Sequence, residues 1–447
     1  MNRVTMRWHD QVAFALFVSG MALLPFSTPA GPDSVVVAFG ILPLALLGCT
    51  YWAIWCWHPA FPREYLPAFS CGLALFAAQT VCTLYSPNFI PSAARWFANA
   101  LGFCVFLYLL SPNLFRLARP RIEPRFRVAL VVLLLSASVL SLYFIVTFVL
   151  AVSNWGFGTV IVQRYVGGVM ALPWGASNVV ASTLIYPVFF ALYLGQQAVF
   201  SRAWRVAFKG SALLLCLAIA LTLSRGAIIA TASGALVLGS LLDFRSRLKF
   251  LGSIALIACT LVAFDYWIMS QQQLPEGLGQ AFLERLQGQE VGTLNTRTEL
   301  WSEYVGLISM APVFGEGYYS SMFLHDNGPH NIVFSTLAER GLLGFLMSAP
   351  IVFYAAWQIG IELVVTRGRR RKSFFVYAAA GGVASMIHLM VEDANFSQPY
   401  IVYSWVFLAI IFVARNQLRT GSGIAHDAWL GGPQQQVSLP RPEALNQ

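Results

Sequence analysis

The chain repeats long apolar blocks of about 20 residues, the length of α-helix that crosses the hydrocarbon core of a bilayer. Of its 447 residues, 57% are hydrophobic and 11% are charged, whereas soluble domains are about 25% charged. A membrane β-barrel would instead show weak alternation over segments of about ten residues. The pattern therefore predicts an all-α polytopic membrane protein.

Hydropathy predicts about twelve transmembrane helices. We expect them over residues 10–26, 34–57, 65–84, 95–111, 127–152, 176–199, 206–223, 226–242, 249–268, 332–364, 374–391 and 400–414. The block at 332–364 exceeds one bilayer crossing, so part of it is expected to project. Residues 1–414 form one membrane-embedded domain in this interpretation. Residues 415–447, rich in Gly, Pro and Gln, are predicted to be a disordered cytoplasmic tail.

The basic residues predict the orientation of the chain. With the N-terminus in the cytoplasm, all but six of the 28 Lys and Arg residues fall on the cytoplasmic side, as the positive-inside rule requires. Both termini are then cytoplasmic, and two long loops, about 153–175 and 269–329, lie on the outer side of the membrane. The net charge of +9 follows from this orientation, so nucleic-acid binding is not needed to explain it.

The six outer basic residues are all arginines, whose guanidinium groups can donate two hydrogen bonds to one phosphate. For any one of them, the alternative is that it anchors a helix at the lipid headgroups. They are Arg95, Arg164, Arg225, Arg285, Arg297 and Arg340. Ser224 can cap the helix that Arg225 begins. Arg225 would lie at the membrane boundary with no acidic residue beside it, which favours a functional role over a structural ion pair.

The large outer loop at about 269–329 is predicted to contain two short helices. The first carries an apolar stripe, Leu278, Phe282 and Leu286, suited to lying on the membrane surface or against the protein. The second is expected to begin at Thr296, with Glu299 completing a capping box, and to end at Pro312. Arg297 would then sit in the first helical turn, where free N–H groups attract an anion.

His330 follows Gly328-Pro329 and is predicted to begin a helix, together with Asn331. A helix N-terminus disfavours the imidazolium, so a neutral ring is available as a general base near pH 7. A hydrogen-bonded structural histidine is the alternative. Glu339, farther along the same segment, is expected to pair with an arginine. A second polar group, His388, Glu392 and Asp393, either receives a polar substrate or forms structural pairs.

Several common catalytic motifs are missing from the sequence. It has no GxxxxGK[ST] phosphate loop, no HExxH zinc motif, and no acidic pair placed for a metal-bound nucleotide sugar on the outer side. No metal ligands and no cofactor are therefore predicted. A donor already activated on a lipid would need none of these groups.

At four places the chain resembles the bacterial O-antigen ligase and polymerase superfamily. His330-Asn331, nine residues and Gly341-Leu-Leu-Gly344 resemble the ligase motif. The other resemblances are Arg297-x-x-x-Trp301 with Pro312 and Gly315-Glu-Gly317, Ser224-Arg225-Gly226, and Ser177-Asn178-Val-Val-Ala181 leading to Pro187. The resemblance covers roughly residues 10–414, including the span topology.

The resemblance implies a metal-independent glycosyltransferase of the bacterial inner membrane, with an undecaprenyl-diphosphate-linked glycan as donor and lipid A–core as acceptor. His330 would be the base, and Arg225, Arg297 and Arg164 would bind the diphosphate. Arg95, Arg285 and Arg340 are weaker phosphate candidates, and Glu339 and Asn331 are supporting residues. An O-antigen polymerase remains the first alternative, and a transporter of an anionic lipid the second.

Overall fold

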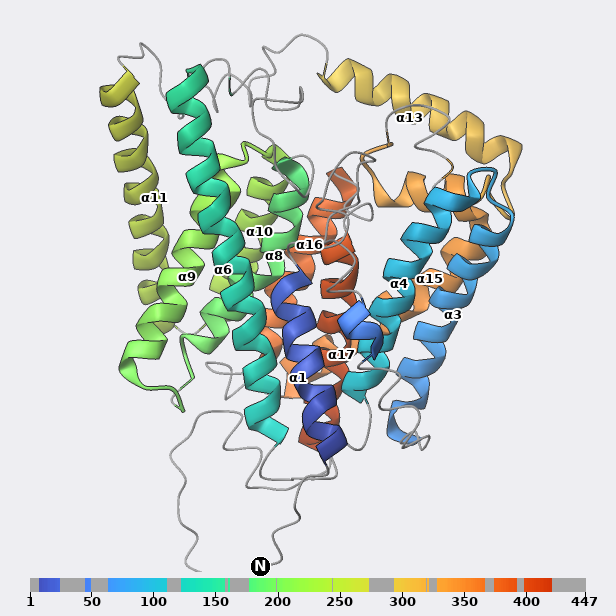
Figure 1. Ribbon diagram of the computed structural model, residues 1–447, viewed down its shortest axis with the longest axis horizontal. Coiled ribbons are helices and arrows are strands. Elements are labelled where there is room, and N and C mark those ends of the chain that lie inside the picture. The colour runs from blue at the N-terminus through green and yellow to red at the C-terminus, as the bar shows by residue number, and fades with distance from the viewer. Residues whose placement is uncertain are drawn as a thin grey trace, which may run out of the picture.

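The computed structural model describes thirteen stretches of the chain. They are residues 8–24, 45–49, 63–110, 122–156, 160, 177–197, 199–242, 244–272, 293–318, 320, 328–365, 374–391 and 398–419. Within these stretches the regular structure is helical and no strand occurs (Figure 1). The all-α prediction is therefore confirmed for the part of the chain that the structure describes.

The helices fall close to the predicted spans. They are α1 (Trp8–Leu23), η2 (Arg63–Tyr65), α3 (Leu66–Leu84), α4 (Phe89–Leu110), α6 (Ile122–Trp155), α8 (Ser177–Leu194), α9 (Arg202–Leu221), α10 (Arg225–Leu241), α11 (Phe244–Gln272), α13 (Thr293–Met310), α15 (Ile332–Val365), α16 (Phe374–Val391) and α17 (Gln398–Arg419). The span expected at 34–57 lies almost wholly outside the described residues, as do the loop at 161–176 and the stripe at 278–286.

Five of the described helical segments are long and apolar enough to cross a membrane. They are Arg63–Leu84, Leu130–Trp155, Arg202–Leu221, Ile332–Val365 and Phe374–Val391. Other described apolar helices, such as Arg225–Leu241, are shorter. The membrane character of the chain is thus supported, while the number of twelve spans stays a prediction.

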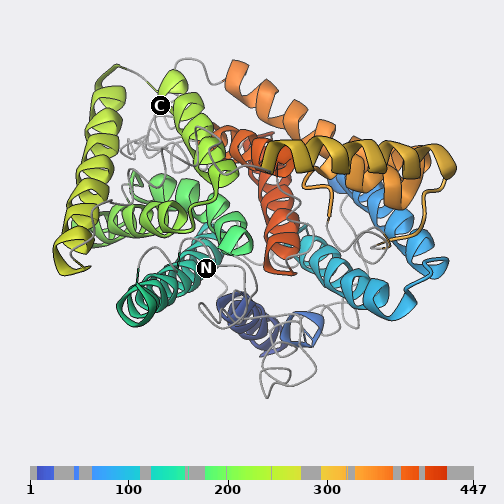
Figure 2. The ribbon, with the colours of Figure 1, turned by 90° about the horizontal axis from the view of Figure 1, so that it is seen from above.

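Most helices stand side by side, and α13 lies across the end of the bundle opposite the start of α1 (Figure 1). Seen from above, α16 and α17 separate a group formed by α6, α8, α9, α10 and α11 from a group formed by α3, α4, α13 and α15 (Figure 2). The closest pairings are α10 with α16, α4 with α17 and α3 with α15. At the α10–α16 crossing, a Cβ on Gly234 would lie 2.7 Å from the Ala380 carbonyl oxygen, so only glycine permits this approach.

Helix α15 is broken at Gly341, whose φ of 62° and ψ of −171° are accessible almost only to glycine. The break divides a first arm, residues 332–340, from a longer second arm, residues 342–365. The block at 332–364 is therefore not one straight helix, and the projection of part of it from the membrane stays a prediction. The first arm packs against α13 through Tyr304, Leu307 and Ala338.

The segment 312–318 bridges this break with backbone hydrogen bonds. The Glu316 and Gly317 N–H groups donate to the carbonyls before the break, at Ala338 (2.8 Å) and Glu339 (3.0 Å). The N–H groups after the break, at Leu342 and Leu343, donate to the carbonyls of Pro312 (2.8 Å) and Val313 (3.1 Å). The bridge satisfies backbone groups that the broken helix leaves open.

The other side of the bridge is fixed to α3 and α4. The Tyr318 N–H donates to the Cys82 carbonyl at 3.0 Å, and the Ser86 and Ser92 hydroxyls donate to the Tyr318 carbonyl. Tyr85 donates from its hydroxyl to the Phe314 carbonyl. Burial raises the pKa of Tyr85 above its ordinary value, and its hydrogen bond with Cys82 adds to the shift, so the donating hydroxyl stays protonated.

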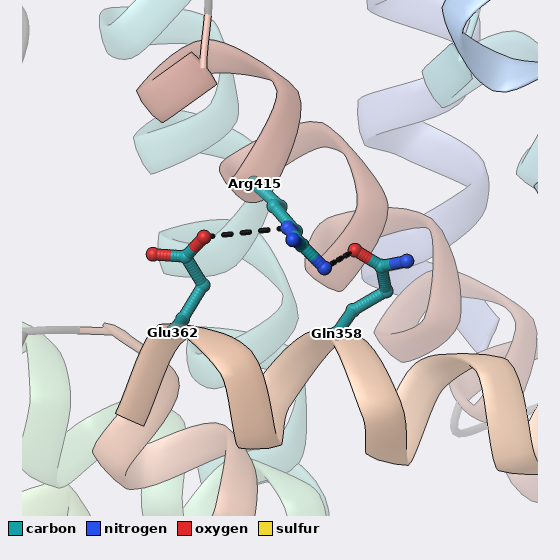
Figure 3. A network of polar contacts seen from close by, with 3 residues as sticks. All are labelled: Gln358, Glu362 and Arg415. Atoms are coloured by element: carbon teal, nitrogen blue, oxygen red, sulfur yellow. Dashed lines mark hydrogen bonds and ion pairs between the residues drawn. The ribbon is translucent and has the colours of Figure 1, made fainter. Parts of the chain in front are cut away.

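Helix α17 continues beyond the predicted domain boundary at residue 414. The helix continues to Arg419, and Arg415 is buried instead of beginning an exposed tail. Its Nε lies 3.3 Å from Glu362 Oε1, and its Nη1 donates to the Gln358 amide oxygen (Figure 3). A buried charge requires such partners, so the pairing extends the folded domain beyond 414. Residues 420–447 of the predicted tail lie outside the described residues.

Candidate functional site

His330 occupies a sharp turn at the entrance to α15. Its φ is 51°, a left-handed conformation that is uncommon for a residue other than glycine. Asn331 follows as the helix cap, with its Oδ1 accepting hydrogen bonds from the N–H groups of Val333 (2.9 Å) and Phe334 (3.3 Å). His330 therefore lies just before the helix and does not begin it: α15 starts at Ile332, with Asn331 as its cap.

Helix α13 fixes the turn that presents His330. The indole Nε1 of Trp301 donates to the Pro329 carbonyl at 2.8 Å. The same indole stacks on Phe334, with ring centroids 5.6 Å apart. The peptide before His330 and the first turn after it are thus tied to a single side chain, which limits how His330 can move.

Replacing Trp301 by phenylalanine should keep the stacking on Phe334 and remove only the bond to Pro329. We expect a loss of about 1 kcal/mol of stability, the usual contribution of one hydrogen bond. We also expect the catalytic rate to fall more than the apparent KM rises, because the turn carrying His330 loosens. Thermal unfolding in detergent and initial rates measure the two effects. Unchanged rates would show that Trp301 does not position His330.

The structure corrects the predicted start of α13. The helix begins at Thr293, not Thr296, so Thr296 lies inside it and does not cap it. The first arm of α15 packs against α13 at Tyr304 and Leu307, and such tertiary packing stabilises a helix beyond its local signals. Arg297 is therefore beyond the first turn, where the helix dipole is strongest. It precedes Trp301 by one helical turn, and its side chain lies outside the described residues.

Arg225 is the first residue of α10, and it is partly buried. The Ser224 hydroxyl accepts a hydrogen bond from the Ala227 N–H at 3.4 Å, which confirms the predicted cap. The preceding residue, Leu223, has a φ of 53°, an outlier for a bulky side chain. In the described residues, Leu223 and His330 are the two non-glycine residues with positive φ, and each directly precedes a capped helix.

The last turn of α16 connects these two helix starts. The Asn331 Nδ2 donates to the Met390 carbonyl at 3.0 Å. At the next residue, Val391 Cγ2 would lie 2.6 Å from a Cβ on Gly226, so the start of α10 abuts the same turn. Arg225 and His330 are each adjacent in sequence to a residue that contacts this turn. The structure thus places the starts of α10 and α15, which follow Arg225 and His330 closely in sequence or include them, against the same turn of α16.

Of the remaining sequence candidates, four are buried in the described helices and four lie outside the described residues. Glu339 and Arg340 are buried beside the break, and Arg95 is buried in α4. His388 is fully buried in α16. The other candidates lie outside the described residues: Arg164, Arg285, Glu392 and Asp393.

Sequence reasoning missed Asn99 and Tyr318, which lie beside Arg340. The Asn99 Nδ2 donates to the Tyr318 hydroxyl at 2.8 Å, and the Arg340 guanidinium carbon lies 4.9 Å from the centre of the Tyr318 ring. The polar residue inside an apolar helix was the available signal for Asn99. Within the described residues, no three His, Cys, Asp or Glu side chains gather as a metal site would need.

Residues 210–349 match the model of the O-antigen ligase family. This segment of the chain is similar to O-antigen ligases. The matched segment runs from α9 to the second arm of α15 and includes Arg225, Arg297, His330 and the bridge to Gly341. No curated protein matches the chain.

The match supports the resemblance to this family over residues 210–349. The family comprises glycosyltransferase-like membrane enzymes, both ligases and polymerases, that use lipid-linked glycans. The residues of the motif that begins at His330 lie at two different points of α15. His330 and Asn331 form the entrance to α15, whereas Gly341 forms its break.

Proposed function

We propose that the protein is an O-antigen ligase. In this proposal it transfers O-antigen polysaccharide from undecaprenyl diphosphate to a sugar hydroxyl of lipid A–core on the periplasmic face of the inner membrane. The observation that carries it is that the helix starts carrying Arg225 and His330, both within residues 210–349, contact the same last turn of α16 through Gly226 and Asn331. The spacing of Gly341 and Gly344 after His330 favours a ligase over a polymerase.

The proposed reaction is a single displacement at the anomeric carbon of the donor sugar. The acceptor hydroxyl oxygen forms the new bond as the bond to the diphosphate oxygen breaks, and His330 takes the hydroxyl proton. Undecaprenyl diphosphate leaves with the bonding electrons, so negative charge develops on its phosphate. Arg225 and Arg297, with Arg164, stabilise that charge, and the anomeric configuration inverts.

Changing Arg225 to glutamine should lower the transfer rate by about 100-fold, a typical loss for one donor that stabilises transition-state charge. Arg225→Lys should recover part of the rate, because it keeps the charge without the forked geometry. Arg202→Gln is a matched control, since Arg202 also follows a serine cap as the first residue of a helix, and it is exposed at the start of α9. Equal losses in the Arg225 and Arg202 variants would contradict the assignment.

A deletion strain tests the function in the cell. Its lipopolysaccharide is resolved on a gel, and the glycan on undecaprenyl diphosphate is probed separately. Bare core, with long polymer accumulating on undecaprenyl diphosphate, is the expected result for a ligase. Core carrying a single repeat unit would identify a polymerase instead. Absence of lipid-linked glycan from the periplasmic side would favour a transporter.

A further inference from the structure

An apolar cavity of about 580 Å³ lies between α15, α16 and α17, with α3 and α4 at one end. Its lining follows the second arm of α15 from the break to Leu363, roughly 30 Å of helix and close to the thickness of a bilayer core. The end of the cavity farther from the break, at Leu363 and Ile411, is next to the buried ion pair of Glu362 and Arg415. Among its lining residues, Val352 and Gly360 are exposed on the outer surface, so the cavity can be entered from the lipid.

The end of the cavity near the break carries one cation. Arg340 lines the cavity and is 5% exposed, and its Nε has no hydrogen-bond partner among the described residues. The stacking on Tyr318, itself held by Asn99, fixes the guanidinium in place. A buried guanidinium group with an open donor is a site for an anion.

Two neutral amides accompany Arg340 at this end. Asn99 and Gln79 line the cavity, and each is 4% exposed. The Gln79 Oε1 has no partner in the described part of the chain, so it calls for a hydroxyl or amide donor from a ligand. In the described lining of this cavity, Arg340 is the one charged residue, which suits a singly charged phosphodiester better than a diphosphate.

We propose that this cavity binds one anionic membrane phospholipid, with an acyl chain between α15, α16 and α17 and its phosphodiester on Arg340. Phosphatidylglycerol fits this chemistry, because its glycerol headgroup also offers a hydroxyl to Gln79. The cavity has the size that encloses drug-sized ligands, which matches one acyl chain and is too small for a whole polyprenyl chain. The lipid would brace the break in α15, and its binding does not depend on the proposed transferase reaction.

Lipid binding is tested on the purified full chain without donor or acceptor. Native mass spectrometry and thermal unfolding are recorded with added phosphatidylglycerol, phosphatidylcholine or polyprenyl phosphate. We expect one bound phosphatidylglycerol per chain and a higher unfolding temperature than with phosphatidylcholine. Arg340→Gln should weaken binding by about tenfold or more, the loss of one charge-assisted contact, and Arg340→Lys by less.

A second variant tests the cavity without touching Arg340. A Cβ on Gly382 would meet only the Phe407 ring, at 3.8 Å, so Gly382→Leu should be accommodated and fill space that the acyl chain needs. It should reduce phosphatidylglycerol binding while the chain stays monodisperse. Wild-type binding in both variants would overturn the proposal. So would variant-sensitive binding of polyprenyl phosphate with no preference for phosphatidylglycerol over phosphatidylcholine.

Discussion

Replacing His330 by asparagine is expected to lower the transfer rate by about 100- to 10,000-fold, the usual contribution of a positioned general base. Asparagine tolerates the left-handed conformation better than most residues, so this variant should keep the turn at φ 51°. It retains hydrogen bonding but cannot accept the hydroxyl proton. Initial rates with purified lipid-linked donor and lipid A–core measure the loss.

The fold of His330→Asn is checked by its unfolding temperature, which should match that of the wild type. If the fold is intact and imidazole added to the assay restores part of the rate, His330 acts through its ring. A variant that transfers glycan within a few-fold of the wild-type rate would remove His330 from the reaction, and the transporter alternative would then gain support.

Replacing Gly341 by alanine is expected to destabilise the protein by about 3 kcal/mol or more, since the native φ and ψ are nearly closed to other residues. The new Cβ would also lie 2.2 Å from the Val313 carbonyl oxygen, inside the hydrogen-bonded bridge. The break in α15 cannot relax without losing that bridge. Thermal unfolding in detergent and the yield of monodisperse protein measure the effect.

Gly360→Ala is the matched control on the same helix. A Cβ at Gly360 would meet nothing within 4 Å, and alanine is favoured over glycine inside a helix by about 0.5–1 kcal/mol. This variant should be as stable as the wild type or slightly more so. Similar unfolding temperatures for Gly341→Ala and Gly360→Ala would refute the structural role assigned to the break.

The helices were predictable because long apolar blocks leave the backbone no other hydrogen-bonded form in a membrane. The Ser224 cap and the helix start after His330 followed from local chemistry alone. Local signals failed where tertiary packing decided the outcome. Helix α13 begins at Thr293, before the local capping signal at Thr296, and α17 continues to Arg419, with Arg415 paired to Glu362 and Gln358.

The junction at the last turn of α16 could not be predicted from the sequence. It depends on contacts of Asn331 with Met390 and of Gly226 with Val391, between segments far apart in the chain. The glycines of the 315–317 segment and Gly341 were visible as a motif. Only the structure shows why glycines stand there: they allow a backbone bridge across the break in α15.

The most direct test of the central claim is transfer by the purified protein in a chelating buffer, supplied with undecaprenyl-diphosphate-linked O-antigen and lipid A–core. The account predicts glycan on the core, one undecaprenyl diphosphate released for each glycan transferred, and an inverted anomeric configuration by nuclear magnetic resonance. Glycans joined to each other on undecaprenyl diphosphate, a retained configuration, or a requirement for a divalent metal would contradict it.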